Sequence, residues 1–138
     1  ETEPNFAKQM CVHWYSGTEQ DLEPYLDLGC YFTLGPDFSA ACGSAADQRL
    51  LRGFSKEEKE QKRSLYQRML QEIPVERLFV ETDGISAVAW TMGEAEAEWD
   101  MLPFALQANM QSLAEATGKN EAELQRQLCQ NLRRFLQG

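Results

Sequence analysis

Three side chains that can bind a metal ion or transfer a proton stand where apolar segments end. His13 lies near the end of the apolar run 10–14, and Glu81 and Asp83 follow the run 78–80. Runs of this kind are typical of strands buried on both faces of a sheet. Parallel α/β folds gather functional side chains at the carboxyl ends of such strands. If the two strands are parallel neighbours, we expect His13 and Asp83 at the same end of one sheet.

Each of these residues also has a structural interpretation. A single histidine near a strand end is more often structural, and an aspartate before a glycine, as in Asp83-Gly84, is typical of a turn or a helix cap. Because side chains alternate along a strand, Glu81 and Asp83 are predicted on the same side. This placement favours a supporting hydrogen-bond role for Glu81.

Length, composition and charge narrow the class of protein. We expect residues 1–138 to form a single domain, which is long enough for its own core. Apolar residues make up 43% and charged residues 25% of the chain, which indicates a globular protein rather than a disordered one. The formal charge of −9 argues against general electrostatic binding to a phosphate backbone. An enzyme of this charge acting on nucleic acid would need metal ions or a local basic rim.

The apolar runs and the cysteines bear on the compartment. No apolar run approaches the roughly 20 residues of a membrane span. The four cysteines are widely spaced, and none forms a CxxC pair. We therefore expect a cytoplasmic protein with reduced thiols and no membrane partner.

The predicted elements alternate between strands and helices, which indicates an α/β fold with parallel strands. Ser55 with Glu58, and Asn120 with Glu123, have the spacing of helix-capping pairs. Strands are predicted at residues 10–14, 30–34 and 78–80, and helices at residues 21–28, 55–73, 100–117 and 120–137. Residues 37–53 are predicted as a loop with one helical turn at 47–51, and residues 85–99 as an irregular segment.

The predicted irregular segment carries two tryptophans and an acidic run. Trp90 and Trp99 could stack a nucleobase or simply pack the segment against the core. The alternating Glu94, Glu96 and Glu98 are typical of a solvated face rather than of a cation site.

Four motifs in order along the chain resemble one protein family. They are HWYSG at 13–17, LDLGCYF at 26–32, the set Ile-Pro-x-x-Arg-Leu-x-x-Glu-Thr-Asp at 73–83, and NLRRF at 131–135. Together they resemble the C-terminal half of the TatD family of metal-dependent hydrolases and DNases. The family's fold is a (β/α)8 barrel with a two-metal site at its C-terminal face. The resemblance implies that this chain forms the C-terminal part of such a barrel, three parallel strands with flanking helices.

The resemblance also implies roles for individual residues. His13 would bind one metal ion, and Asp83 would bind the other and accept a proton from the attacking water. Glu81, Ser16 and Tyr15 would line the site or support its ligands. The ions would be Mg²⁺, Mn²⁺ or Zn²⁺, and the substrate would be DNA or another phosphodiester.

The chain departs from the family in one respect that matters for activity. The family's opening His-x-His pair and its further ligands are absent, because His13 is the only histidine. We therefore expect an incomplete site, inactive by itself, that forms a two-metal centre only with the missing N-terminal half. A homodimer, or association with that half, would cover the open sheet edges. The alternatives are an inactive truncated binding or assembly module, and a related barrel hydrolase with a non-nucleic substrate.

Overall fold

The protein is built around a small parallel sheet. The computed structural model describes residues 10–42, except 16 and 19, and residues 53–137. The strands are β1 (Cys11–Val12), β2 (Tyr31–Leu34) and β3 (Leu78–Val80), which lie in the order β1-β2-β3. Both pairings are parallel, with Val12 opposite Phe32 and Phe32 opposite Leu78. The predicted α/β class is confirmed, and the arrangement is compatible with part of a TatD-like barrel.

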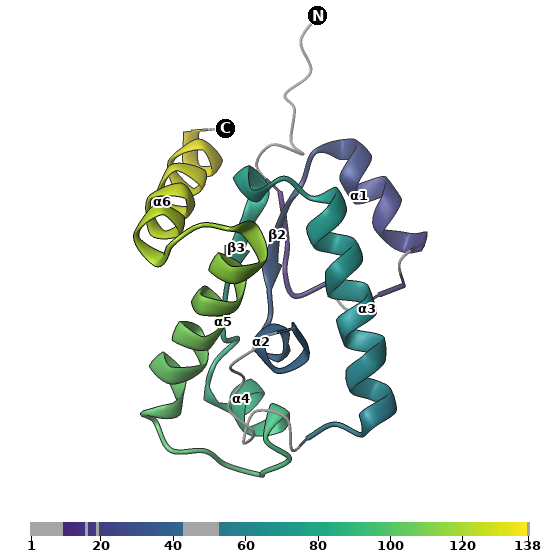
Figure 1. The fold of residues 1–138 in the computed structure, drawn as a ribbon, viewed down its shortest axis with the longest axis vertical. Coiled ribbons are helices and arrows are strands. Elements are labelled where there is room, and N and C mark those ends of the chain that lie inside the picture. The colour runs from purple at the N-terminus through teal and green to yellow at the C-terminus, as the bar shows by residue number, and fades with distance from the viewer. Residues whose placement is uncertain (1–9, 16, 19, 43–52, 138) are drawn as a thin grey trace, which may run out of the picture.

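Helices flank this sheet on its faces and ends (Figure 1). They are the 3₁₀ turn η2 (Gln20–Leu22), α1 (Glu23–Leu28), α2 (Asp37–Cys42), α3 (Lys56–Glu72), the 3₁₀ turn η4 (Val75–Arg77), α4 (Ile85–Thr91), α5 (Met101–Thr117) and α6 (Glu121–Gln137). Among the described residues, no helix combines the length and the apolar composition needed to cross a membrane.

Local sequence signals account for the limits of the long helices. The Ser55 hydroxyl accepts from the amide of Glu58, and the Glu58 carboxylate accepts from the amide of Ser55, so the predicted capping box is confirmed. Asn120 and Glu123 make the same reciprocal pair before α6. Gly29 closes α1 with φ of 79°, a left-handed conformation that glycine adopts without strain.

Two sequence predictions were wrong. The segment after β2 begins with the helix α2 rather than a loop, and the segment after β3 begins with the helix α4 rather than irregular chain. In α4, Val88 and Ala89 are buried, because this short helix packs against α5. The helical turn predicted at 47–51 lies outside the described residues.

The two faces of the sheet differ in character. On one face, Phe32, Leu34 and Leu78 are buried in the main core with residues of α3 and α5. On the other face, Tyr31 and Phe79 stack with ring centroids 5.6 Å apart, and Phe135 of α6 packs edge-on to both. This second face leads, at the carboxyl ends of the strands, to the predicted site residues. The helices α2 and α4 lie beyond those ends (Figure 1).

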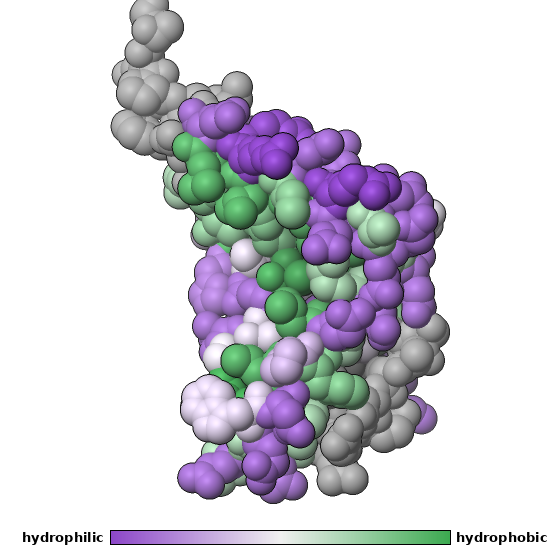
Figure 2. All heavy atoms as spheres, turned by 90° about the vertical axis from the view of Figure 1, so that its left-hand side faces the viewer, coloured by the Kyte–Doolittle hydropathy of each residue, from purple (hydrophilic) through white to green (hydrophobic). Residues whose placement is uncertain are grey.

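An apolar groove of about 700 Å³ lies along β3 between α5 and α6. Phe79 and Val80 of the strand contribute to it, together with Leu106 and Leu132 of the helices. Figure 2 shows hydrophobic side chains gathered on this face among polar ones. Among the described residues, β3 pairs only with β2, so its other edge faces this side without a strand partner.

Candidate metal centre

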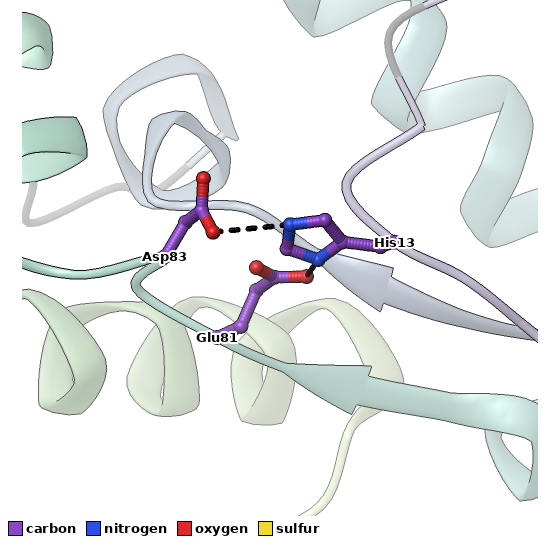
Figure 3. A group of neighbouring side chains, drawn as sticks. All are labelled: His13, Glu81 and Asp83. Atoms are coloured by element: carbon purple, nitrogen blue, oxygen red, sulfur yellow. Dashed lines mark hydrogen bonds and ion pairs between the residues drawn. The ribbon is translucent and has the colours of Figure 1, made fainter.

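His13, Glu81 and Asp83 meet at the carboxyl ends of β1 and β3 (Figure 3). The His13 Nδ1 atom is 2.6 Å from Glu81 Oε2, and His13 Nε2 is 3.0 Å from Asp83 Oδ1. The imidazole therefore lies between two carboxylates that come from a single strand end. The sequence prediction that His13 and Asp83 open at the same end of the sheet is confirmed.

Hydrogen bonds of Thr33 in β2 fix this arrangement. The Thr33 hydroxyl donates to Glu81 Oε2, and the same hydroxyl accepts from the backbone amide of Trp14 at 2.8 Å. Glu81 thus accepts from both Thr33 and the Nδ1–H group of His13. When Nδ1 carries the proton, Glu81 accepts its hydrogen bond and the Nε2 lone pair faces Asp83. A carboxylate in the position of Glu81 commonly orients a metal-binding histidine in this way.

The backbone at both strand tips takes conformations that few side chains adopt. Asp83 has φ of 56° and Trp14 has φ of 42°. Aspartate tolerates the left-handed region, but the bulky Trp14 does so at a cost in free energy. Positions of this kind concentrate at functional sites. Here they turn the chain directly after β1 and after Glu81, which aims His13 and Asp83 at each other.

The side chain of Asn109 in α5 joins the segments that follow β2 and β3 by hydrogen bonds. Its side-chain amide donates to the carbonyls of Gly35 at 2.8 Å and Glu81 at 3.1 Å, and its carbonyl accepts from the amide of Ser39 at 3.0 Å. Asn109 is fully buried, so these bonds have no competing water. The position of Glu81 therefore depends on a residue of α5.

The charges of the cluster favour a bound cation. Desolvation lowers the pKa of His13, but the hydrogen bond to Glu81 and the charges of Glu81 and Asp83 outweigh it and raise the pKa overall. Burial raises the pKa of Glu81, although the hydrogen bond and charge of His13 act in the opposite direction. The two carboxylates thus make the imidazole bind a proton more tightly than a free imidazole does in water. The same negative potential attracts a metal ion.

The donor set fits a divalent ion. One ligand atom from each of the three residues lies within 4.8 Å of the other two. Neighbouring ligands of one ion at a distance of about 2.1 Å are roughly 3 Å apart, and this is the separation of His13 Nε2 and Asp83 Oδ1. The side chains of His13 and Asp83 are 60% and 42% exposed, whereas that of Glu81 is 15% exposed. The first two are open to solvent and the third supports them from inside.

Comparison with protein families decides the relationship of the chain. The family model for TatD related DNases matches residues 1–137. The chain belongs to the TatD family. A search of curated proteins found no match. Members of the TatD family are metal-dependent hydrolases, and the His13–Glu81–Asp83 cluster could hold a metal ion.

The TatD resemblance also pointed to Tyr15 and Ser16. Tyr15 is buried, its hydroxyl donates to the carbonyl of Thr18, and its ring packs edge-on to Tyr25. Ser16 lies outside the described residues. Sequence reasoning missed Thr33 and Asn109. The signals that could have indicated them are a threonine between two apolar residues of a buried strand, and an asparagine that lies four residues from the apolar Ala105 and Leu113 on one face of α5.

Proposed function

We propose that this chain contributes a metal-binding half-site to a TatD-type hydrolase of phosphodiesters, with DNA as the expected substrate. The observation that carries the proposal is the convergence of His13, Glu81 and Asp83 at the carboxyl ends of parallel strands. Membership of the TatD family supports the class of reaction. A bound divalent ion would supply a Lewis acid that polarises the phosphate and lowers the pKa of water.

The three residues divide the work. Because His13 Nε2 and Asp83 Oδ1 are only 3.0 Å apart, one ion would be held by both atoms, rather than one ion by each residue as the TatD resemblance implies. The second oxygen of Asp83 remains available to accept a proton from the attacking water. Glu81 keeps the Nδ1 proton of His13 in place and so fixes the tautomer that offers Nε2 as a ligand. His13 and Asp83 are open to solvent, which leaves room for the substrate and for ligands from another polypeptide.

The first experiment uses His13 as a reporter. Because it is the only histidine of the 138 residues, its imidazole resonances report on this site alone. Titration of the purified chain with Mn²⁺ is expected to broaden the His13 resonances before those of residues elsewhere, and EDTA should restore them. Unchanged His13 resonances at Mn²⁺ concentrations that broaden other carboxylate-rich surfaces would refute the metal centre.

The second experiment concerns turnover. One histidine and two carboxylates leave most positions of a hard cation to water, since such ions take about six ligands. We therefore expect very slow release of nucleotides from single-stranded DNA by the chain alone with Mg²⁺ or Mn²⁺. Fast, EDTA-sensitive release of nucleotides would show that the half-site hypothesis is wrong and that the chain carries a complete site.

A catalytically inactive binding or assembly module is the second candidate, and the single histidine favours it. The discriminating result is nucleic-acid binding in EDTA without metal-dependent cleavage, even after addition of a polypeptide that supplies the missing ligands. Cleavage of a simple phosphodiester, but not of DNA, by such a mixture would instead favour a non-nucleic substrate.

A further inference from the structure

Three aromatic rings form a patch next to the metal centre, which we call the Trp90 patch and which consists of Trp14, Phe54 and Trp90. The rings of Trp14 and Trp90 are 5.7 Å apart, and those of Phe54 and Trp90 are 5.0 Å apart, both edge-on. Trp14 directly follows His13. Trp90 belongs to α4, the helix that begins two residues after Asp83. The patch and the metal centre therefore share the same strand ends.

Trp90 is half-exposed although its surroundings hold it in place. Its side chain retains 49% exposure, while Val88, Ala89 and Thr91 beside it in α4 are buried. The amide of Gly53 donates to the carbonyl of Thr91 at 2.8 Å, and a Cβ at Gly53 would clash with the carbonyl oxygen of Trp90. Only glycine fits there, so the chain before α3 runs tightly against α4 and brings Phe54 to the Trp90 ring.

The Trp14 ring is fixed in the same way. A Cβ at Gly35 would clash with Trp14 Cδ1, so the indole packs directly on the backbone after β2. The Trp14 Nε1–H group donates to the buried Asp37 at 3.0 Å. The orientation of the Trp14 ring relative to Trp90 is therefore fixed by the chain after β2 and by α2.

A lysine completes the patch without giving it net charge. The Lys62 ammonium lies 4.9 Å from the centre of the Phe54 ring and 5.3 Å from that of Trp90. The same ammonium donates to Asp37 at 2.9 Å. Asp37 neutralises it, so Lys62 stiffens the patch by cation–π contact and adds little attraction for a phosphate.

We propose that Trp90, backed by Trp14 and Phe54, is a stacking platform for one nucleobase of a single-stranded nucleic acid whose backbone passes the metal centre. The inference rests on the proposed function, because the nucleic-acid strand must lie across His13 and Asp83. An aromatic ring that is exposed, rigid and next to such a site is how proteins hold single strands without reading sequence. The chain carries a formal charge of −9, so stacking, not phosphate attraction, has to supply the affinity.

The test measures binding in EDTA, which separates it from metal binding and from hydrolysis. The probe is a fluorescent oligothymidylate of about 8 nucleotides, within the usual size of a single-strand site. Trp90→Ala is expected to weaken binding roughly 10-fold to 100-fold, as loss of one stacked base does. Trp90→Phe keeps a ring and should retain most of the affinity. Trp99→Ala removes a tryptophan that is 74% exposed and lies outside the patch, so it should bind as the unchanged chain does.

Two further probes separate the base from the backbone and the strand from the free nucleotide. An abasic oligonucleotide of the same length should bind weakly to all the proteins, with no difference between the unchanged chain and Trp90→Ala. Thymidine monophosphate should bind much more weakly than the oligonucleotide. Binding should fall little with added salt, since Lys62 is already paired.

The proposal is overturned if Trp90→Ala binds the oligothymidylate as tightly as the unchanged chain. Equal loss for the abasic and base-containing probes would also overturn it, because the platform would then recognise the backbone. Thymidine monophosphate binding as tightly as the oligonucleotide would show that the ligand is a free nucleotide rather than a strand. Failure of Mn²⁺ to bind at His13 would leave these results unaffected, and it would refute the proposed metal centre instead.

Discussion

Asp83 combines a negative charge with a left-handed backbone, and the two properties can be separated by substitution. Asparagine adopts φ near 56° as readily as aspartate, so Asp83→Asn should preserve the turn after β3. It lacks the charge that attracts a cation and accepts a proton. We expect Mn²⁺ affinity to fall roughly 10-fold to 100-fold. In the absence of metal, and at a pH at which His13 is neutral, the melting temperature should not change. Broadening of the His13 resonances and thermal unfolding measure the two effects.

Glu81→Gln is the matched comparison for Asp83→Asn. Glutamine can still accept from His13 Nδ1–H through its amide oxygen, so the tautomer of His13 is weakened rather than lost. We expect a smaller loss of Mn²⁺ affinity than for Asp83→Asn. A larger loss for Glu81→Gln would show that Glu81, and not Asp83, is the principal carboxylate ligand.

The raised pKa of His13 makes a prediction about pH in the metal-free protein. The folded pKa lies above the unfolded value of 6.5, so the protonated imidazole stabilises the fold below about pH 6.5. This contribution is lost as the pH rises through the folded pKa. An NMR titration of His13 should therefore give a pKa above 6.5, and His13→Gln should remove the matching change in unfolding midpoint. The diamagnetic Zn²⁺, which leaves the His13 resonances visible, should lower the apparent pKa, because the ion competes with the proton at Nε2. A pKa at or below 6.5 would contradict the described contacts.

At the scale of elements, α5 holds the strand tips through one side chain. Asn109→Ala would deprive the carbonyl of Glu81 and the amide of Ser39 of their side-chain partner, whereas the carbonyl of Gly35 would still accept from the amide of Phe38. Each such group costs about 1–3 kcal/mol, so we expect a loss on the order of 3 kcal/mol in unfolding free energy. The control is Gln111→Ala on the exposed side of the same helix, which should change stability by less than about 0.5 kcal/mol.

The same substitution has a second readout. Since Asn109 positions Glu81, Asn109→Ala should also weaken Mn²⁺ binding at His13 under conditions where the protein remains folded. Chemical denaturation and the Mn²⁺ titration measure the two effects separately. A stability loss with unchanged Mn²⁺ affinity would show that Asn109 supports the core without positioning the metal centre.

Elements with strong local signals were predictable from the sequence, and those without them were not. The strands correspond to short apolar runs, and the capping pairs Ser55–Glu58 and Asn120–Glu123 predict where α3 and α6 begin. The helix α4 starts at Gly84 without a side-chain cap, and its residues Ile85 and Val88 are β-branched, which suits strands better. The apolar residues Ile85, Val88, Ala89 and Met92 nevertheless have helical spacing.

The site divides in the same way. His13 and Asp83 could be placed together from the sequence because parallel strands expose their carboxyl ends at one edge. Thr33 and Asn109 could not be placed there, because they contact Glu81 from positions 48 and 28 residues away along the chain. Such contacts follow from how strands and helices pack in three dimensions, which residue spacing along the chain does not contain.

At the scale of the whole molecule, the apolar groove along β3 should act as a contact surface, as the expected dimerisation requires. An unpaired strand edge beside exposed hydrophobic side chains is the kind of surface that associates in water. Leu106 and Leu132 line the groove and remain substantially exposed. We propose that a second copy of this chain covers it.

The groove makes the last prediction specific. Sedimentation of the purified chain at high micromolar concentration should show reversible self-association. Leu132→Glu places a charge in the groove, and its burial against a partner would be costly, so this variant should sediment as a monomer. The control, Leu28→Glu, introduces the same charge at an exposed leucine of α1, on the other side of the molecule (Figure 1), and should associate as the unchanged chain does. A stable monomer of the unchanged chain, or equal behaviour of the two variants, would mean that the groove does not bind a second copy.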